Sequence, residues 1–218
     1  MNFRYNKEVN IPVGKIMLQG ELMIPVKADG IIIFSHGSGS SRFSKRNQMV
    51  AKYLQEKNFG TLLFDLLTTD EDLHYSNRFD IDLLTKRLAG ATEWLEKFPA
   101  AKDCRIGYFG ASTGAASALR AASFLPQVSA VVSRGGRPDL AMDYLHNVAA
   151  PTLFIVGSLD NEVIKLNQKA FEQLRCEKKM EIISGATHLF EEKGKMREVG
   201  DLSAEWFEKY LYPVSALK

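Results

Sequence analysis

The sequence predicts an α/β fold in which a mostly parallel sheet carries helices on both faces and begins with an antiparallel hairpin. Residues 30–34 form a short, continuously apolar run, which is typical of a strand buried on both faces, and residues 128–133 read as another strand of this buried type. Segments with the apolar spacing of helices alternate with such runs along the chain. Because a strand–helix–strand order sets neighbouring strands parallel, this alternation indicates one sheet that is covered on both faces.

The first elements of the fold are two segments, residues 9–13 and 16–25, in which apolar and polar side chains alternate. Such alternation is typical of strands with one face buried. Val13-Gly14-Lys15 supplies a turn between the two segments. The sequence therefore predicts an antiparallel hairpin at the N-terminus.

The remaining elements alternate between strand and helix. Residues 43–57 have helical apolar spacing and end at the stop signal Asn58-Phe59-Gly60, so this segment predicts a helix. A polar loop is expected at residues 68–77. From the same patterns we expect strands at residues 61–67, 105–109, 128–133, 151–156 and 179–183, and helices at residues 81–97, 115–125, 138–147, 162–174 and 202–211.

The composition is that of an ordinary globular protein. The chain has 218 residues, of which 45% are hydrophobic and 25% charged, and this suits a single α/β domain spanning residues 1–218. A net charge of +2, from 28 basic and 26 acidic residues, gives no electrostatic case for nucleic acid or an anionic membrane. We therefore expect neither of these partners.

The N-terminus and the cysteines favour a cytoplasmic location. The first residues lack the apolar core of a signal peptide, and no apolar run is long enough to span a bilayer. Cys104 and Cys176 have no metal-like spacing, so we expect two thiols rather than a disulfide or a metal site. The oligomeric state stays open.

The stretch Gly110-Ala111-Ser112-Thr113-Gly114 has the Gly-x-Ser-x-Gly pattern of a nucleophile elbow. In such a turn a strand meets a helix sharply and the serine hydroxyl is exposed. The residues two before and two after the serine have to be small because strand and helix crowd together there, and Gly110 and Gly114 satisfy this. A β-run precedes the pattern and an Ala-rich helical segment follows it, so Ser112 is the candidate nucleophile.

Asp160 and His188 lie in loops that follow two later strands. Ligands of open α/β sheets bind beyond the carboxyl ends of the strands, so Ser112, Asp160 and His188 are expected at one edge. An imidazole that titrates near neutral pH takes the serine proton, and a carboxylate fixes its tautomer. The order Ser, Asp, His is that of α/β-hydrolases, and of the four histidines only His188 follows Asp160.

Two backbone amides are expected to bind the oxyanion of the tetrahedral intermediate. One is the amide of Thr113, directly after the nucleophile and at a helix N-terminus. The second should come from the loop His36-Gly37-Ser38-Gly39, whose glycines allow a tight bend, and we favour the amide of Ser38. His36 itself is expected to be structural.

Other residues have competing interpretations. Asp160 also suits the N-cap of the helix that follows it, and Glu162 and Glu181 are rival acids, although Glu181 lies inside a strand. Arg134 and Arg137 sit at the carboxyl end of a strand, where a guanidinium can bind a substrate carboxylate or phosphate bidentately. Pairing with a nearby aspartate is the alternative for both arginines, and we carry Arg134 forward as a substrate-binding candidate.

The chain resembles the dienelactone hydrolase-like branch of the α/β-hydrolase superfamily over nearly its whole length. The resemblance implies a single α/β-hydrolase domain without a cap and an acyl-enzyme mechanism. True dienelactone hydrolases carry cysteine at the elbow, whereas this chain carries Ser112, which favours a serine esterase. The matching motifs are His36-Gly37-Ser38-Gly39, Gly110-Ala111-Ser112-Thr113-Gly114, Gly157-Ser158-Leu159-Asp160 and Gly185-Ala186-Thr187-His188-Leu189-Phe190.

The sequence thus predicts a serine hydrolase that cleaves a small carboxylic ester, thioester or lactone without a cofactor or metal. Ser112, His188 and Asp160 form the expected triad, with Thr113 and Ser38 at the oxyanion. An acyltransferase or peptidase with the same triad is one alternative. A binding module that kept the fold and lost the activity is the other.

Overall fold

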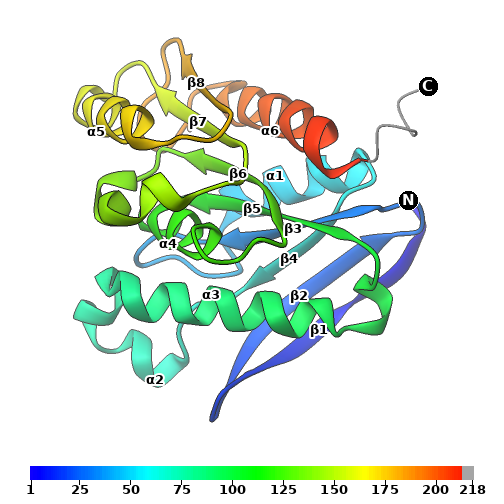
Figure 1. The fold of residues 1–218 in the computed structure, drawn as a ribbon. Coiled ribbons are helices and arrows are strands. Elements are labelled where there is room, and N and C mark those ends of the chain that lie inside the picture. The colour runs from blue at the N-terminus through cyan, green and yellow to red at the C-terminus, as the bar shows by residue number, and fades with distance from the viewer. Residues whose placement is uncertain (213–218) are drawn as a thin grey trace.

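One eight-stranded sheet forms the centre of the structure, a computed structural model that describes residues 1–212. In chain order the strands are β1 (Phe3–Val13), β2 (Ile16–Pro25), β3 (Gly30–Ser35), β4 (Gly60–Phe64), β5 (Arg105–Ala111), β6 (Val128–Arg134), β7 (Thr152–Gly157) and β8 (Lys178–Ile183). They lie in the order β1-β2-β4-β3-β5-β6-β7-β8 (Figure 1). β2 is antiparallel to both of its neighbours, and the pairings from β4 through β8 are parallel. The predicted mostly parallel sheet and N-terminal hairpin are confirmed.

Helices cover both faces of this sheet. The helices are α1 (Lys45–Glu56), α2 (Thr69–Asp72), α3 (Ile81–Glu96), α4 (Thr113–Ala122), α5 (Asn161–Gln173) and α6 (Lys195–Leu211), with 3₁₀ segments η1 (Tyr75–Phe79), η2 (Pro99–Ala101) and η3 (Pro138–Asn147). α1 and α6 pack together on one face, while α3, α4, η3 and α5 line the other (Figure 1). The sheet therefore has a separate apolar core on each side.

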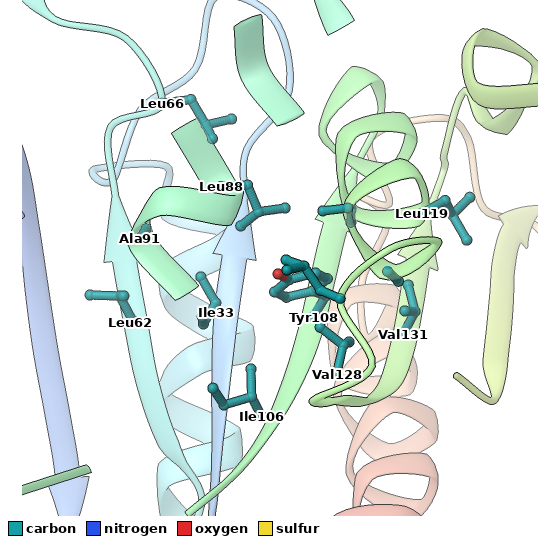
Figure 2. Packing of buried hydrophobic residues seen from close by; sticks show 14 of the residues in the cluster. Ile33, Leu62, Leu66, Leu88, Ala91, Ile106, Tyr108, Leu119, Val128 and Val131 are labelled. Carbon is teal, nitrogen blue, oxygen red and sulfur yellow. The ribbon is translucent and has the colours of Figure 1, made fainter. Parts of the chain in front are cut away.

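The core beneath α3 and α4 shows why the central strands read as continuous apolar runs. Ile33, Tyr108 and Val131 from neighbouring strands meet Leu88 of α3 and Leu119 of α4, all fully buried (Figure 2). The Tyr108 hydroxyl lies 2.6 Å from Thr92 Oγ1, which satisfies the polar atom that this ring carries into the core. Alternate residues of the same strands face the second core under α1 and α6.

Local signals explain where the helices begin and end. Ser44 and Asp80 cap α1 and α3 by accepting hydrogen bonds from backbone amides three residues ahead. Asn58, after the end of α1, has a φ of 66°, a left-handed conformation that asparagine tolerates better than most residues. The expected stop signal at this point is therefore a real chain reversal.

Several elements differ from the sequence prediction. β1 begins at Phe3, not at residue 9, and pairs with β2 from there to Val13. α6 begins at Lys195, not near residue 202, because Met196 and Val199 extend its buried face between charged residues that hide the pattern. The segment at residues 138–147 is a kinked 3₁₀ helix whose break falls at Ala141. The predicted polar loop at residues 68–77 contains α2, whose N-terminus is stabilised by a capping box between Thr68 and Glu71.

None of the helices described in residues 1–212 combines the length and the apolar character needed to cross a lipid bilayer.

Candidate active site

Ser112 stands at the sharp junction between β5 and α4. Its backbone has φ 51° and ψ −123°, a conformation that residues other than glycine rarely adopt and that has to be held by its surroundings. The Ser112 amide donates to the carbonyl of Arg134 at 3.3 Å, and the Ser112 carbonyl accepts from the amides of Ala115 and Arg137, both at 3.0 Å. These hydrogen bonds tie the strained turn to β6 and to the first turn of α4.

The two glycines of the elbow have no room for a side chain. A Cβ atom at Gly110 would lie 2.5 Å from Ala115 Cα, and one at Gly114 would lie 2.1 Å from the carbonyl oxygen of Ser35. Both are backbone atoms that cannot move aside without disturbing β3 or α4. The crowding expected of a strand–helix elbow is therefore present on both sides of Ser112.

Asp160 and His188 are brought into direct contact. Asp160 follows β7 and does not use its side chain to cap α5. Its Oδ2 atom lies 2.7 Å from His188 Nδ1, where an ionised carboxylate can only accept, so His188 donates through Nδ1. The other ring nitrogen, Nε2, is thereby left as the proton acceptor. Asp160 thus occupies the N-cap position of α5, as the alternative interpretation expects, but its side chain contacts His188 instead of capping the helix.

The loop that carries His188 is fixed by several contacts. The Leu159 amide donates to the carbonyl of Ala186 at 3.0 Å, which joins this loop to the one that carries Asp160. Thr187 donates through its amide and its hydroxyl to one carboxylate oxygen of Glu192, at 3.2 and 2.6 Å. The residues on the amino side of His188 are therefore held independently of the Asp160 contact.

His188 also lies against the end of β6. A Cβ placed on Gly135 would be 3.5 Å from His188 Cε1 and 3.2 Å from the His188 carbonyl oxygen. The residue before Gly135 is Arg134, and its carbonyl accepts a hydrogen bond from the Ser112 amide. The end of β6 therefore contacts the His188 loop through Gly135 and the elbow through Arg134. Within the described residues, no hydrogen bond joins the Ser112 hydroxyl to the imidazole.

The two amides expected at the oxyanion lie in adjoining segments. Gly37 packs on the elbow so closely that a Cβ there would be 3.1 Å from Ser112 Cβ. The amide of Ser38 donates to Thr113 Oγ1 at 2.9 Å, and Thr113 is buried at the N-terminus of α4. The Thr113 side chain thus joins the loop after β3 to the elbow, a role that the sequence analysis missed. A hydroxyl residue directly after the nucleophile was the signal that could have indicated it.

His36 holds the loop after β3 in place, as expected from the sequence. Its Nδ1 donates to the carbonyl of Gly37 at 3.0 Å, and its Nε2 accepts the amide of Leu66 at 3.0 Å. Burial lowers the pKa of His36, which favours the neutral ring. With both ring nitrogens occupied, His36 has no free site to act as a base.

The two arginines after β6 have different surroundings. Arg137 forms a bidentate pair with Asp139, with N–O distances of 2.9 and 2.8 Å, so the structural interpretation holds for Arg137. Arg134 is only 6% exposed, and its guanidinium carbon lies 5.7 Å from the centroid of the Phe190 ring. Burial and, secondarily, the charge of Arg46 lower the pKa of Arg134 to about 10.

The rival acids lie in other arrangements. Glu181 forms an ion pair with Lys179 within β8. Glu162 occupies the first turn of α5, where a negative charge suits the helix dipole. The carboxylate that contacts His188 is that of Asp160.

Comparison with known proteins places this geometry in a family. The family model described as the dienelactone hydrolase family matches residues 18–211. The solved structure of a dienelactone hydrolase from Anabaena variabilis is 51% identical, superposes with a TM-score of 0.93, and the match covers 95% of this chain and 99% of that one. Est1E from Butyrivibrio proteoclasticus, at 16% identity, shares the fold with a TM-score of 0.79 over 93% of this chain and 98% of its own.

Two curated proteins of Mycobacterium tuberculosis are also similar. Each carries the name "Putative phosphoribosyl transferase" (MT0597 and Rv0571c), and each is 49% identical over 208 residues, or 94% of this chain. The match covers 47% of the length of those proteins, so the chain spans about half of them. On the extent of the family match and the identity to the Anabaena protein, the chain belongs to the dienelactone hydrolase family, a family of hydrolases on the α/β-hydrolase fold.

Proposed function

We propose that the protein is a serine hydrolase that cleaves a small carboxylic ester, thioester or lactone through an acyl-enzyme. The observation that supports this most directly is the Asp160–His188 contact at 2.7 Å, set against the strained turn that presents Ser112. A serine hydroxyl is a weak nucleophile until a base takes its proton. The Asp160 carboxylate holds Nδ1 of His188 as the donor, so Nε2 is the nitrogen available for that proton.

In the proposed reaction Ser112 Oγ forms a bond to the carbonyl carbon as its proton passes to His188 Nε2. The carbonyl electron pair moves to the oxygen, where the Thr113 and Ser38 amides stabilise the negative charge. When the tetrahedral intermediate collapses, the leaving group takes the proton from His188. Water then attacks the acyl-enzyme, with His188 as the base, and Ser112 is released.

The Ser38 amide needs a change of partner in this scheme. In the structure it donates to Thr113 Oγ1, so the oxyanion has to share or replace that acceptor. In such an exchange, a hydrogen bond to the neutral Thr113 hydroxyl is replaced by one to a charged oxygen as the intermediate forms. Charged acceptors bind an N–H roughly twice as strongly as neutral ones, which favours the transition state over the free enzyme.

The proposal is tested by labelling with a fluorophosphonate probe and by turnover of p-nitrophenyl acetate. We expect the probe to attach to Ser112, and Ser112→Ala to lower kcat by roughly 10⁴-fold or more. Ser129→Ala, at the opposite end of β6, is the matched control and should behave as the unaltered protein. Wild-type turnover by Ser112→Ala would exclude the mechanism, and an unlabelled, inactive protein would favour a binding module.

The same acyl-enzyme would support transfer to an acceptor other than water. Addition of an alcohol or amine to the assay separates the two outcomes, because an acyltransferase forms the new ester or amide in preference to the free acid. We expect the free acid to be the main product. Peptidase action is tested in parallel with the corresponding p-nitroanilide, for which we expect much slower turnover.

A further inference from the structure

Arg134 is a buried cation with no counter-ion among residues 1–212. It is 6% exposed, and within residues 1–212 no hydrogen bond or ion pair involves its guanidinium. Its Nε atom is buried without a partner. A buried charge is costly unless it is paired, and native proteins seldom leave one unpaired without a functional reason.

The charge of a second arginine acts on the pKa of Arg134. Arg46, in the first turn of α1, lowers the pKa of Arg134 further, which is the mark of a like charge nearby. The Nε atom of Arg46 is also buried without a partner. Arg134 lies over the ring of Phe190, and Arg46 pairs with Glu191, the next residue, so the two arginines contact consecutive residues of one loop. Their like charges add to the cost of burial.

Glu191 offsets only part of this charge. Its Oε1 lies 2.7 Å from Arg46 Nη1, and the Glu191 side chain is 61% exposed, so solvent screens the pair. The guanidinium of Arg134 lies over the face of the Phe190 ring. Against two positive charges there is one screened negative charge, and the site keeps an uncompensated positive charge.

The backbone of Arg134 lies beside the candidate triad. The carbonyl of Arg134 accepts the amide of Ser112, and Gly135, the next residue, contacts His188. Phe190 and Glu191 follow His188 directly in the chain. An anion bound by these arginines would therefore lie on the strand end and the loop that position Ser112 and His188.

We propose that Arg134 and Arg46 form a subsite for an oxyanion, a carboxylate or a phosphate monoester, on the substrate of this enzyme. The anion supplies the counter-charge that the fold leaves out, and its oxygens accept from the guanidinium N–H groups, including Nε. Planar guanidinium forks suit both kinds of anion. Glu191 holds Arg46 in place while the subsite is empty. As a substrate subsite this rests on the proposed hydrolase function, whereas anion binding itself does not.

Anion binding is measured first, without catalysis, on Ser112→Ala. Thermal unfolding is followed in sodium phosphate, in sodium succinate and in sodium chloride of equal ionic strength. We expect phosphate, succinate or both to raise the Tm above the chloride value, because a ligand that binds the folded state stabilises it. A rise with phosphate alone identifies a phosphate subsite, and a rise with succinate alone identifies a carboxylate subsite.

Variants assign the effect to the two arginines. Arg134→Met and Arg46→Gln should each remove most of the anion-dependent rise in Tm, while Arg197→Gln, which removes an exposed charge on α6, should keep it. In chloride alone, Arg134→Met should unfold at a higher temperature than the unaltered protein, because it removes an unpaired buried charge. If Arg134 has a purely structural role, Arg134→Met should instead unfold at a lower temperature than the unaltered protein.

The kinetic measurement compares a neutral ester with the ester of the same alcohol that carries a terminal carboxylate. We expect the ratio of kcat/KM, anionic over neutral, to fall about tenfold to a hundredfold in Arg134→Met, as for a lost charged hydrogen bond. Equal anion responses in Arg134→Met, Arg46→Gln and the unaltered protein would overturn the subsite even if Ser112 proves catalytic. An anion response that requires both arginines in a protein without esterase activity would instead overturn the proposed function and leave the anion site.

Discussion

The amide of Ser38 and the hydroxyl of Thr113 are joined by a 2.9 Å hydrogen bond, so the loop after β3 is tied to the residue that follows the nucleophile. The bond links two segments 75 positions apart in the chain. It also gives one proposed oxyanion donor an acceptor within the protein.

Thr113→Val removes the hydroxyl and keeps both backbone amides. We expect it to lower the free energy of unfolding by about 1 kcal/mol, the usual cost of a lost hydrogen bond with a buried partner. Because the proposed donors are amides, kcat for p-nitrophenyl acetate should change less than tenfold. Thr113→Ser serves as the control and should restore the stability. A hundredfold loss of kcat in the valine variant would mean that the hydroxyl itself binds the oxyanion.

Asp160→Asn should separate orientation from charge at His188. The amide can donate a proton to Nδ1 and so select the wrong tautomer, which costs about 10⁴ in kcat in the triad of serine proteases. We expect a loss of that order with little change in KM. Asp139→Asn, whose carboxylate pairs with Arg137, is the matched control and should retain activity. A loss of less than tenfold in Asp160→Asn would point to another acid as the partner of His188.

His36 makes stability depend on pH. Burial holds its pKa below the ordinary value of 6.5, so the unfolded chain binds more protons at mildly acidic pH than the folded one. Its contribution to stability is therefore complete above pH 6.5 and is lost as the pH falls below that value. Urea unfolding at pH 7.5 and pH 5 should show a smaller difference in His36→Gln than in the unaltered protein.

The control for His36 is His146→Gln, because His146 is exposed. It should keep the full difference in unfolding free energy between the two pH values. An unchanged difference in His36→Gln would show that carboxylates alone account for the acid sensitivity.

Gly114→Ala should destabilise the protein far more than a strained glycine elsewhere. The added Cβ would lie 2.1 Å from the carbonyl of Ser35, a backbone atom in β3. We expect a loss of about 4 kcal/mol or more, or insoluble protein. Gly14→Ala adds a Cβ in open space at a φ of 62° and should cost only about 1 kcal/mol. Similar urea midpoints for the two variants would contradict this account of the elbow.

The sequence was a good guide wherever a local pattern determines the structure. Continuous apolar runs located the central strands, and the glycines at positions 110 and 114 marked the elbow because crowding there permits no other residue. The order of Ser112, Asp160 and His188 along strand ends was enough to predict the contact of the last two. That contact follows from topology, because the carboxyl ends of parallel strands share an edge.

Features that depend on contacts between distant segments were not predicted. Nothing near Arg134 in the chain indicates that Phe190 packs against its guanidinium, since 56 positions separate the two residues. The start of α6 was missed because charged residues interrupt its apolar face. The single domain over residues 1–218, the cytoplasmic location and the absence of nucleic-acid and membrane partners stay predictions.

The turn at Ser112 is held without any use of the serine side chain. Its hydrogen bonds run through the Ser112 amide and carbonyl, and its steric limits are imposed by the glycines on either side. The scaffold therefore fixes where a nucleophilic atom stands and leaves open which element it is. A thiol could take the place of the hydroxyl with the same backbone. A single Ser-to-Cys substitution would therefore exchange the nucleophilic oxygen for sulfur without a change in the turn.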